Sequence, residues 1–161
     1  MKNYFLLIGL LFGSVFFVSC EDDDVCIGEA TPAMTVVFRN ILNMENQSDT
    51  LTIYASPDLN FENSILLYEK IFTDSLKLPL GSLAQSQTYF KIQRRSNEVS
   101  DILKVDYQTH SEYVSKACGF RLTYENLNFE TTQNHIQYLI PGESNQLKNE
   151  SKTNLYIILG N

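Results

Sequence analysis

The sequence predicts an all-β protein: an antiparallel β-sandwich of about seven to eight strands, with a closed β-barrel as the alternative. In short runs over most of the chain, every second residue is apolar, which is typical of half-buried strands. Clusters of Pro, Gly, Asn, Asp and Ser separate these runs. Beyond the N-terminus no long segment has a helical period, so these patterns together favour one all-β domain.

Residues 1–19 are predicted to be a lipoprotein signal peptide, which precedes the domain as a helix. Lys2 supplies a positive start, and residues 4–17 are uncharged and almost wholly apolar. This run is shorter than the roughly 20 residues that cross a bilayer as a helix. Residues 17–20 read Phe-Val-Ser-Cys and resemble a lipobox. We therefore expect cleavage before Cys20, a lipid on its thiol, and a place in the outer membrane, on its periplasmic face or at the cell surface.

Residues 20–32 are predicted to be a lipidated acidic tether, and residues 33–161 a single β domain. Residues 21–24 are all acidic and are expected to remain solvated. The net charge of -7 becomes more negative when Lys2 leaves with the signal peptide. Such a surface repels phosphates, so no nucleic-acid partner is expected. The lipid must supply the membrane contact, because the Arg94-Arg95 doublet is interpreted as a solvated strand end.

The alternating runs place the strands of the domain. We expect aromatic side chains to lie in the core or beside cross-strand neighbours rather than in a ligand cage. Residues 61–80 fit a helix or a strand; we favour a strand or irregular structure, followed by a short extended piece at 76–80. The other predicted strands are 34–39, 51–54, 90–93, 103–107 and 120–124, and the two closing strands 135–140 and 155–159.

Turn residues separate these strands. His110 and Ser111 are expected at a hairpin turn between Tyr107 and Tyr113. Prolines cannot donate a hydrogen bond within a sheet, so Pro79 and Pro141 are expected at strand edges or ends. The other predicted turns are 43–49, 56–58 and 141–145.

Cys26 and Cys118, the two cysteines left after lipidation of Cys20, are predicted to form one disulfide. Exported proteins fold in an oxidising environment, which favours pairing. For a loop of this length the chain-entropy model gives a stabilisation of about 4 to 5 kcal/mol. Two free thiols are the alternative. A redox or metal-binding pair is disfavoured, since the chain has no CxxC spacing and no histidine placed to partner it.

The sequence predicts no catalytic site, no cofactor and no metal site. His110 and His135 lie in separate segments without a metal-binding spacing, and no nucleophile-elbow, P-loop or dinucleotide motif occurs. Residues 22–24 lack the spacing and the glycine of a calcium loop. A Ser-His-acid triad assembled only in space leaves no signature and stays open. Most of the scattered acids are interpreted as solvent-facing, namely Glu62, Glu69, Asp101, Asp106, Glu112 and Glu125.

Several segments together resemble a known family. They are the Cys20 lipobox, an acidic stretch leading into residues 24–27, Thr31-Pro32, Leu78-Pro79-Leu80 and above all the Val-Ser-Lys-Ala-Cys-Gly-Phe block at 114–120. The chain is similar in these features to small uncharacterised lipoproteins of Bacteroidota, chiefly flavobacteria, that carry a domain of unknown function. The resemblance implies that the two later cysteines recur as a pair, which supports the disulfide, and it implies no catalytic residue.

The same resemblance bears on location and modification. Acids after the lipidated cysteine resemble a surface-export signal of this phylum, with a plain tether as the alternative. Residues 49–51 and 74–76 resemble its Asp-Ser/Thr-apolar O-glycosylation sites.

We therefore predict a lipid-anchored cell-envelope module that binds a partner or supports a structure and is not an enzyme. Its expected partners are the membrane, through the lipid, and an envelope protein or glycan. One alternative is a glycan-active or nutrient-capture surface lipoprotein. The other is an accessory subunit of an envelope complex, which an exposed apolar patch would favour.

Overall fold

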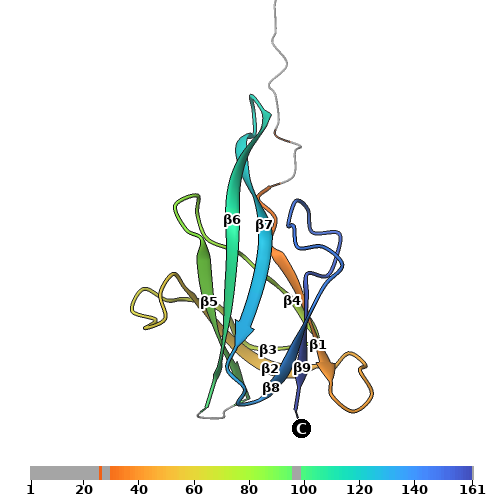
Figure 1. The fold of residues 1–161 in the computed structure, drawn as a ribbon. Coiled ribbons are helices and arrows are strands. Elements are labelled where there is room, and N and C mark those ends of the chain that lie inside the picture. Colours follow the sequence, from red (N-terminus) through yellow and green to blue (C-terminus); the bar gives the residue numbers. More distant parts are fainter. Residues whose placement is uncertain (1–25, 27–29, 96–98, 161) are drawn as a thin grey trace, which may run out of the picture.

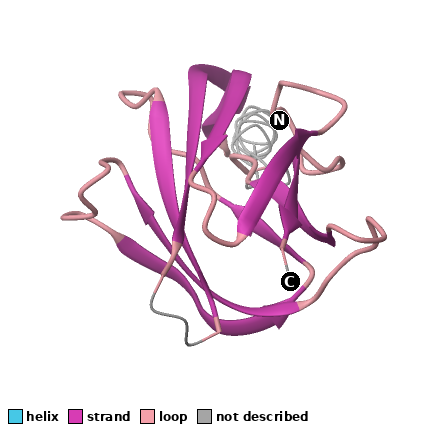
Figure 2. Cartoon of the chain, turned by 60° about the horizontal axis from the view of Figure 1, so that its bottom comes forward, coloured by secondary structure: helices cyan, strands magenta, loops and turns pink. Residues whose placement is uncertain are grey.

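The computed structural model describes residue 26 and residues 30–95 and 99–160, and all of their regular elements are strands (Figures 1 and 2). The expected signal-peptide helix and Cys20 lie outside these residues. The strands are β1 (Met34–Asn40), β2 (Asp49–Ser56), β3 (Ile65–Thr73), β4 (Ser75–Leu78), β5 (Gln87–Arg94), β6 (Asp101–Ser115), β7 (Gly119–Thr131), β8 (Ile136–Pro141) and β9 (Leu155–Leu159).

The strands form two separate sheets, so the predicted all-β sandwich is confirmed and the barrel alternative is wrong. One sheet has the order β4-β1-β9-β8 and the other β3-β2-β5-β6-β7. Neighbouring strands are antiparallel except β1 and β9, which run parallel. The strand count exceeds the predicted seven to eight because residues 61–80 form both β3 and β4. Pro79 follows edge strand β4 and Pro141 ends edge strand β8, as expected.

The core fills the space between the two sheets with the alternating residues that predicted the strands. Met34, Val36 and Phe38 of β1 are buried, as are Leu51 and Ile53 of β2. Full burial of one such side chain stabilises the fold by about 1.5–3 kcal/mol. The same cluster also has members from β4, β5, β6, β7, β8 and β9 and includes Leu147 of the loop between β8 and β9. Period-two alternation therefore identifies the inward face of most strands.

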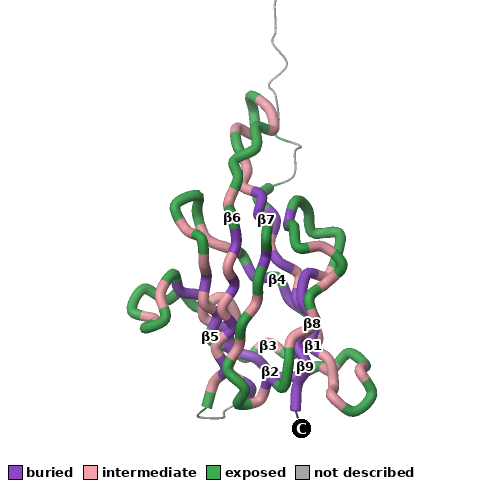
Figure 3. Tube along the Cα trace, viewed as in Figure 1, coloured by how far each residue is buried: buried purple, intermediate pink, exposed green. Residues whose placement is uncertain are grey.

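The β6–β7 hairpin is longer than predicted and projects beyond the sandwich (Figures 1 and 3). The turn expected at His110 and Ser111 is wrong, because β6 continues through them to Ser115. Their polar side chains suit a solvated two-stranded ribbon as well as a turn. The chain turns instead at residues 116–118, followed by Gly119, whose φ of 69° is in the left-handed region that glycine favours.

A buried ion pair joins the two sheets at one end of the sandwich. Asp49 begins β2, and its Oδ2 accepts a hydrogen bond of 2.6 Å from Nε of Arg94, the last residue of β5. Arg94 Nη1 also donates to the Gly160 carbonyl just after β9, at 2.9 Å. Arg94 is therefore buried, and its interpretation as a solvated strand end is wrong, whereas Arg95 is exposed. A single guanidinium thus connects three strands.

Asp101 plays a similar part where the chain crosses from β7 to β8. Its Oδ2 accepts hydrogen bonds from the amides of His135 and Ile136, at 2.8 and 3.1 Å. Its Oδ1 accepts from the Asn134 amide and the Thr132 hydroxyl, at 2.7 and 3.0 Å. Asp101 is fully buried, so its interpretation as a solvent-facing acid is wrong. The carboxylate instead satisfies backbone donors of the crossover.

Two tyrosines of the β6–β7 hairpin hold the segment that follows β4. The Tyr107 hydroxyl accepts a hydrogen bond from the Gly81 amide at 2.9 Å, and the Tyr124 hydroxyl donates to the Gly81 carbonyl at 3.0 Å. A Cβ at position 81 would lie 2.5 Å from the Tyr107 hydroxyl, so this approach requires glycine. The two rings meet edge to face, 5.2 Å apart. Residues 78–80 of the family-like motif thereby lead from one sheet to the other.

We predict that Asp49→Asn lowers the free energy of unfolding by about 3 kcal/mol, because it leaves the buried Arg94 without its charged partner. Burial raises the pKa of Asp49, but hydrogen bonds from Arg94 and from the Thr50 amide outweigh it, so the pKa lies below the ordinary 3.8. The stabilisation is therefore complete above that value and lost as the pH falls towards the folded-state pKa. Urea unfolding of both proteins between neutral and acidic pH measures both effects.

The matched control is Arg95→Ala. Arg95 also contacts Asp49, at 3.2 Å, but its side chain is 71% exposed, so its loss should cost no more than about 1 kcal/mol. Equal losses in the two variants would contradict the assignment of Arg94 as the buried partner.

A second prediction concerns alkaline pH. Burial, and to a lesser extent Tyr107, raises the pKa of Tyr124 to about 12 from the ordinary 10.0. The folded state therefore favours the neutral phenol, whose stabilisation is complete below pH 10.0 and lost as the pH rises to about 12. Tyr124→Phe should cost about 1 kcal/mol at neutral pH, through the hydrogen bond to Gly81, and should unfold with a weaker alkaline dependence. Urea midpoints across this pH range measure it; identical slopes would count against the assignment.

Candidate functional site

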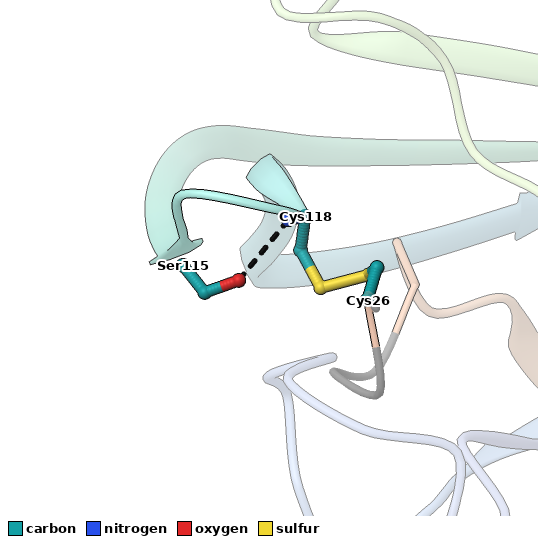
Figure 4. The surroundings of a disulfide bond; sticks show 3 residues. All are labelled: Cys26, Ser115 and Cys118. Carbon is teal, nitrogen blue, oxygen red and sulfur yellow. Dashed lines mark hydrogen bonds between the residues drawn. A yellow bond between two sulfur atoms is a disulfide. The ribbon is translucent and has the colours of Figure 1, made fainter. Parts of the chain in front are cut away.

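The described chain begins at a disulfide on the end of the projecting hairpin. Cys26 is bonded to Cys118, with 4.8 Å between their Cα atoms and 92 positions between them in sequence. Figure 4 shows the bond beside Ser115, whose hydroxyl oxygen accepts a hydrogen bond from the Cys118 amide at 3.0 Å. The predicted pairing is thus present in the structure, and the free-thiol alternative is not. The N-terminal segment is covalently attached to the turn between β6 and β7.

Two further contacts hold the N-terminal segment against the domain. The Thr31 hydroxyl accepts a hydrogen bond from the Leu122 amide of β7 at 3.0 Å. The Ala33 amide donates to Oε1 of Glu150, in the loop between β8 and β9, at 2.9 Å. The other oxygen of Glu150 pairs with Lys77, and this hydrogen bond, with that of Ala33, holds the pKa of Glu150 below its ordinary value. Cys26, Thr31 and Ala33 are therefore each attached to the domain.

The residues around the hairpin turn, 113–120, form a surface that we call the hairpin tip. It contains no acid and one lysine, in a chain with a net charge of -7. Tyr113 and Phe120 are opposite one another on β6 and β7, with ring centroids 5.4 Å apart at 66°. Their exposed fractions are 55% and 70%. Phe120 begins the apolar alternation of the predicted strand 120–124, but it is exposed because this part of the hairpin projects beyond the sandwich (Figure 3).

The base of the hairpin tip has an ion pair. Glu112 and Arg121 are opposite one another, and Oε2 of the glutamate lies 3.0 Å from Nη2 of the arginine. This pair neutralises the acid nearest to the tip. The tip therefore presents two aromatic rings above a balanced pair of charges.

The structure does not bring the two histidines together. His110 lies in the outer half of β6, and its Nε2 is 3.6 Å from Oε2 of Glu125. His135 lies at the far end of the hairpin, where its amide binds Asp101 at the start of β6. No group of three or more metal-ligating side chains occurs within residues 26, 30–95 and 99–160.

A cavity of about 330 Å³ combines an aromatic ring with an acid, lined in part by Tyr89, Lys104 and Glu130. Nζ of Lys104 lies 2.9 Å from Oδ2 of Asp106 and 3.5 Å from Oε2 of Glu130. The hydrogen bond with Asp106 is the main cause that raises the pKa of Lys104. The cavity lining itself thus has one acid, Glu130, whereas glycoside hydrolysis uses a pair of acids that flank the scissile bond.

The hairpin tip is the feature that the sequence-based interpretation did not recognise as a site. The sequence identifies residues 114–120 as a family-like block and residues 120–124 as a strand, but neither pattern indicates a binding surface. The available signal was the stretch of eight residues without an acid in an acidic chain. Within the described part of the chain, no helix is long and apolar enough to cross a bilayer.

Comparison with known families gives one match. The model of a family of unknown function, DUF6452, matches residues 50–159, which is more than half of the chain. The chain belongs to the DUF6452 family. The matched region of this DUF6452 protein includes the Leu78-Pro79-Leu80 segment and the block around Cys118, whereas Cys20 and Cys26 precede it. No curated protein and no solved structure matches the chain.

We predict that Cys118→Ser lowers the free energy of unfolding by about 2–5 kcal/mol, because the disulfide restricts the unfolded chain. Guanidinium unfolding of oxidised wild type, reduced wild type and the variant measures this. Reduced wild type should match the variant, and Cys26→Ser should match both. For the thiol count, Ellman's reagent should find no free thiol in denatured, exported protein carrying Cys20→Ser until a reductant is added. Two reactive thiols before reduction would contradict the bond.

Proposed function

We propose that this DUF6452 protein is a lipid-anchored module of the bacterial cell envelope that binds a partner or supports a structure without chemistry of its own. Its anchor is a lipid on Cys20, and its place is the outer membrane, on the periplasmic face or at the cell surface. Lipoproteins of Bacteroidota are the class that it resembles in sequence.

The Cys26–Cys118 disulfide is the observation that carries this proposal. Disulfides persist in oxidising compartments and are rare in the cytosol of mesophiles. The bond ties the chain only six positions after Cys20, so it supports a mature protein whose folded part begins close to residue 20. The lipobox-like residues 17–20 support the same boundary. Multiple acyl chains, as bacterial lipoproteins carry, anchor far more firmly than a single chain.

The roles of the buried charges support a binding or structural module over an enzyme. The carboxylates of Asp49 and Asp101 and the guanidinium of Arg94 are each engaged in joining strands or crossovers. Lys104, which lines the cavity beside Tyr89, pairs with Glu130 of the same lining and with Asp106. The cavity lining thus has one acid, which is paired with a lysine, whereas the glycan-active alternative needs two acids that flank the glycosidic bond.

An accessory subunit of an envelope complex is the second candidate, and edge strand β3 favours it. Ile65, Leu66 and Phe72 of this strand are exposed. Among the described strands β3 lies at the edge of its sheet and pairs with β2, so its other edge offers backbone groups to an added strand. A charged stretch at Glu69 and Lys70 interrupts the apolar side chains, and such charges limit self-association of an edge.

The test of the anchor is Cys20→Ala in the native host. Wild-type protein should incorporate labelled palmitate and partition into detergent, and the variant should lose both properties, because no thiol remains at the predicted acceptor position. Globomycin, which blocks lipoprotein signal cleavage, should cause a precursor to accumulate. The variant Cys118→Ser serves as control, since it removes a cysteine but should keep the label. Palmitate incorporation by Cys20→Ala would refute the anchor.

A further inference from the structure

The distance between the predicted anchor and the hairpin tip is limited by covalent geometry. Six positions separate Cys20 from Cys26. An extended chain spans at most about 3.6 Å per residue, which gives a reach of about 22 Å. Because Cys26 is bonded to Cys118 in the turn of the hairpin, with 4.8 Å between their Cα atoms, that turn stays within about 27 Å of the Cα atom of Cys20. The disulfide thus selects which end of the domain stays near the bilayer.

The hairpin presents its tip at one extreme of the molecule. β6 has 15 residues, which at about 3.3 Å per residue correspond to about 50 Å of strand. β6 begins at the end of the sandwich where the described C-terminus also lies (Figure 1). The tip lies at the opposite end, beyond the loops of the sandwich (Figures 1 and 3). No loop of the sandwich therefore stands between the tip and a nearby surface.

The chemistry of the tip fits the interface of a phospholipid bilayer. Aromatic side chains concentrate at the headgroup level, where an apolar ring can leave water without losing every polar contact. Tyr113 and Phe120 form such a pair, and Lys116 supplies a long side chain that can reach the headgroup phosphates. The tip has no acid, so its approach requires no desolvation of a carboxylate. The acidic residues 21–24 oppose an anionic surface, which favours a zwitterionic one.

We propose that the hairpin tip docks on the bilayer that holds the lipid anchor, with Tyr113 and Phe120 inserted among zwitterionic phospholipid headgroups. This inference rests on the proposed lipidation of Cys20. The lipid and the tip then form two points of attachment that are joined through the Cys26–Cys118 disulfide. The end of the sandwich that holds Phe72 faces away from the membrane.

The chain contains no tryptophan, so a single introduced tryptophan reports its own surroundings. Mature, lipidated Phe120→Trp is reconstituted into phosphatidylcholine and phosphatidylethanolamine vesicles with or without brominated acyl chains. We expect its emission to shift to the blue on reconstitution and to lose most of its intensity with brominated lipid. The matched control is Phe72→Trp, at a residue that is 72% exposed and pairs with Thr50 near the opposite end of the sandwich. It should show neither effect.

Two measurements separate the outcomes. Flotation of the vesicles reports the anchor: protein that does not float refutes the lipidation and the docking together. Protein that floats but leaves Phe120→Trp unquenched overturns the docking and retains the anchor. Circular dichroism establishes that the variant is folded, and Tyr113→Trp repeats the measurement on the neighbouring strand. The floating Cys26→Ser/Cys118→Ser form of Phe120→Trp should be quenched less, because its tip is no longer held near the lipid.

Discussion

The Cys26–Cys118 disulfide is the constraint on which the arrangement of the projecting end of the molecule depends. An isolated two-stranded ribbon is marginally stable in water, and the outer part of β6 and β7 has no second sheet above it. The bond, together with the Thr31–Leu122 hydrogen bond, gives this ribbon a third partner in the N-terminal segment. The same two contacts attach Cys26 and Thr31 to the ribbon. Removal of the disulfide therefore affects both the ribbon and the attachment of Cys26.

Within the sandwich, apolar packing and polar contacts determine different features of the fold. Alternating apolar residues specify which face of each strand is buried, but such packing is tolerant of small shifts between sheets. Directional contacts define the remaining geometry: Arg94 reaches the end of β9, Asp101 holds the crossover into β8, and the tyrosine pair holds Gly81 after β4. All three occur where the chain or a side chain passes between the sheets. These polar contacts therefore fix the position of one sheet relative to the other, whereas apolar packing alone only holds the two sheets together.

The difference between these two kinds of interaction explains what could be predicted from the sequence. Period-two strands, the positions of Pro79 and Pro141, and the disulfide depend on local pattern or on a count, and all were predicted. The burial of Arg94 and Asp101 was not, because Arg94 pairs across 45 positions and Asp101 across 34. The length of the hairpin also escaped prediction, since polar residues at 108–112 suit a turn and a solvated ribbon alike. Because the hairpin is longer than predicted, Phe120 lies on its projecting part and is exposed, which the sequence did not indicate.

The proposed lipid on Cys20 would by itself restrain the distance of the domain from the membrane but not its orientation, because a single attachment leaves the domain free to tilt and rotate. A second contact at the hairpin tip removes most of that freedom, and the disulfide brings the two attachments close enough to act together. The contact need not bind strongly on its own: once the lipid is inserted, the tip meets the bilayer at the high effective concentration that a short linker imposes. On this proposal, two exposed rings are enough to orient the domain. Edge strand β3 and the surface around Phe72 then lie at a fixed distance from the membrane, where a partner can bind them.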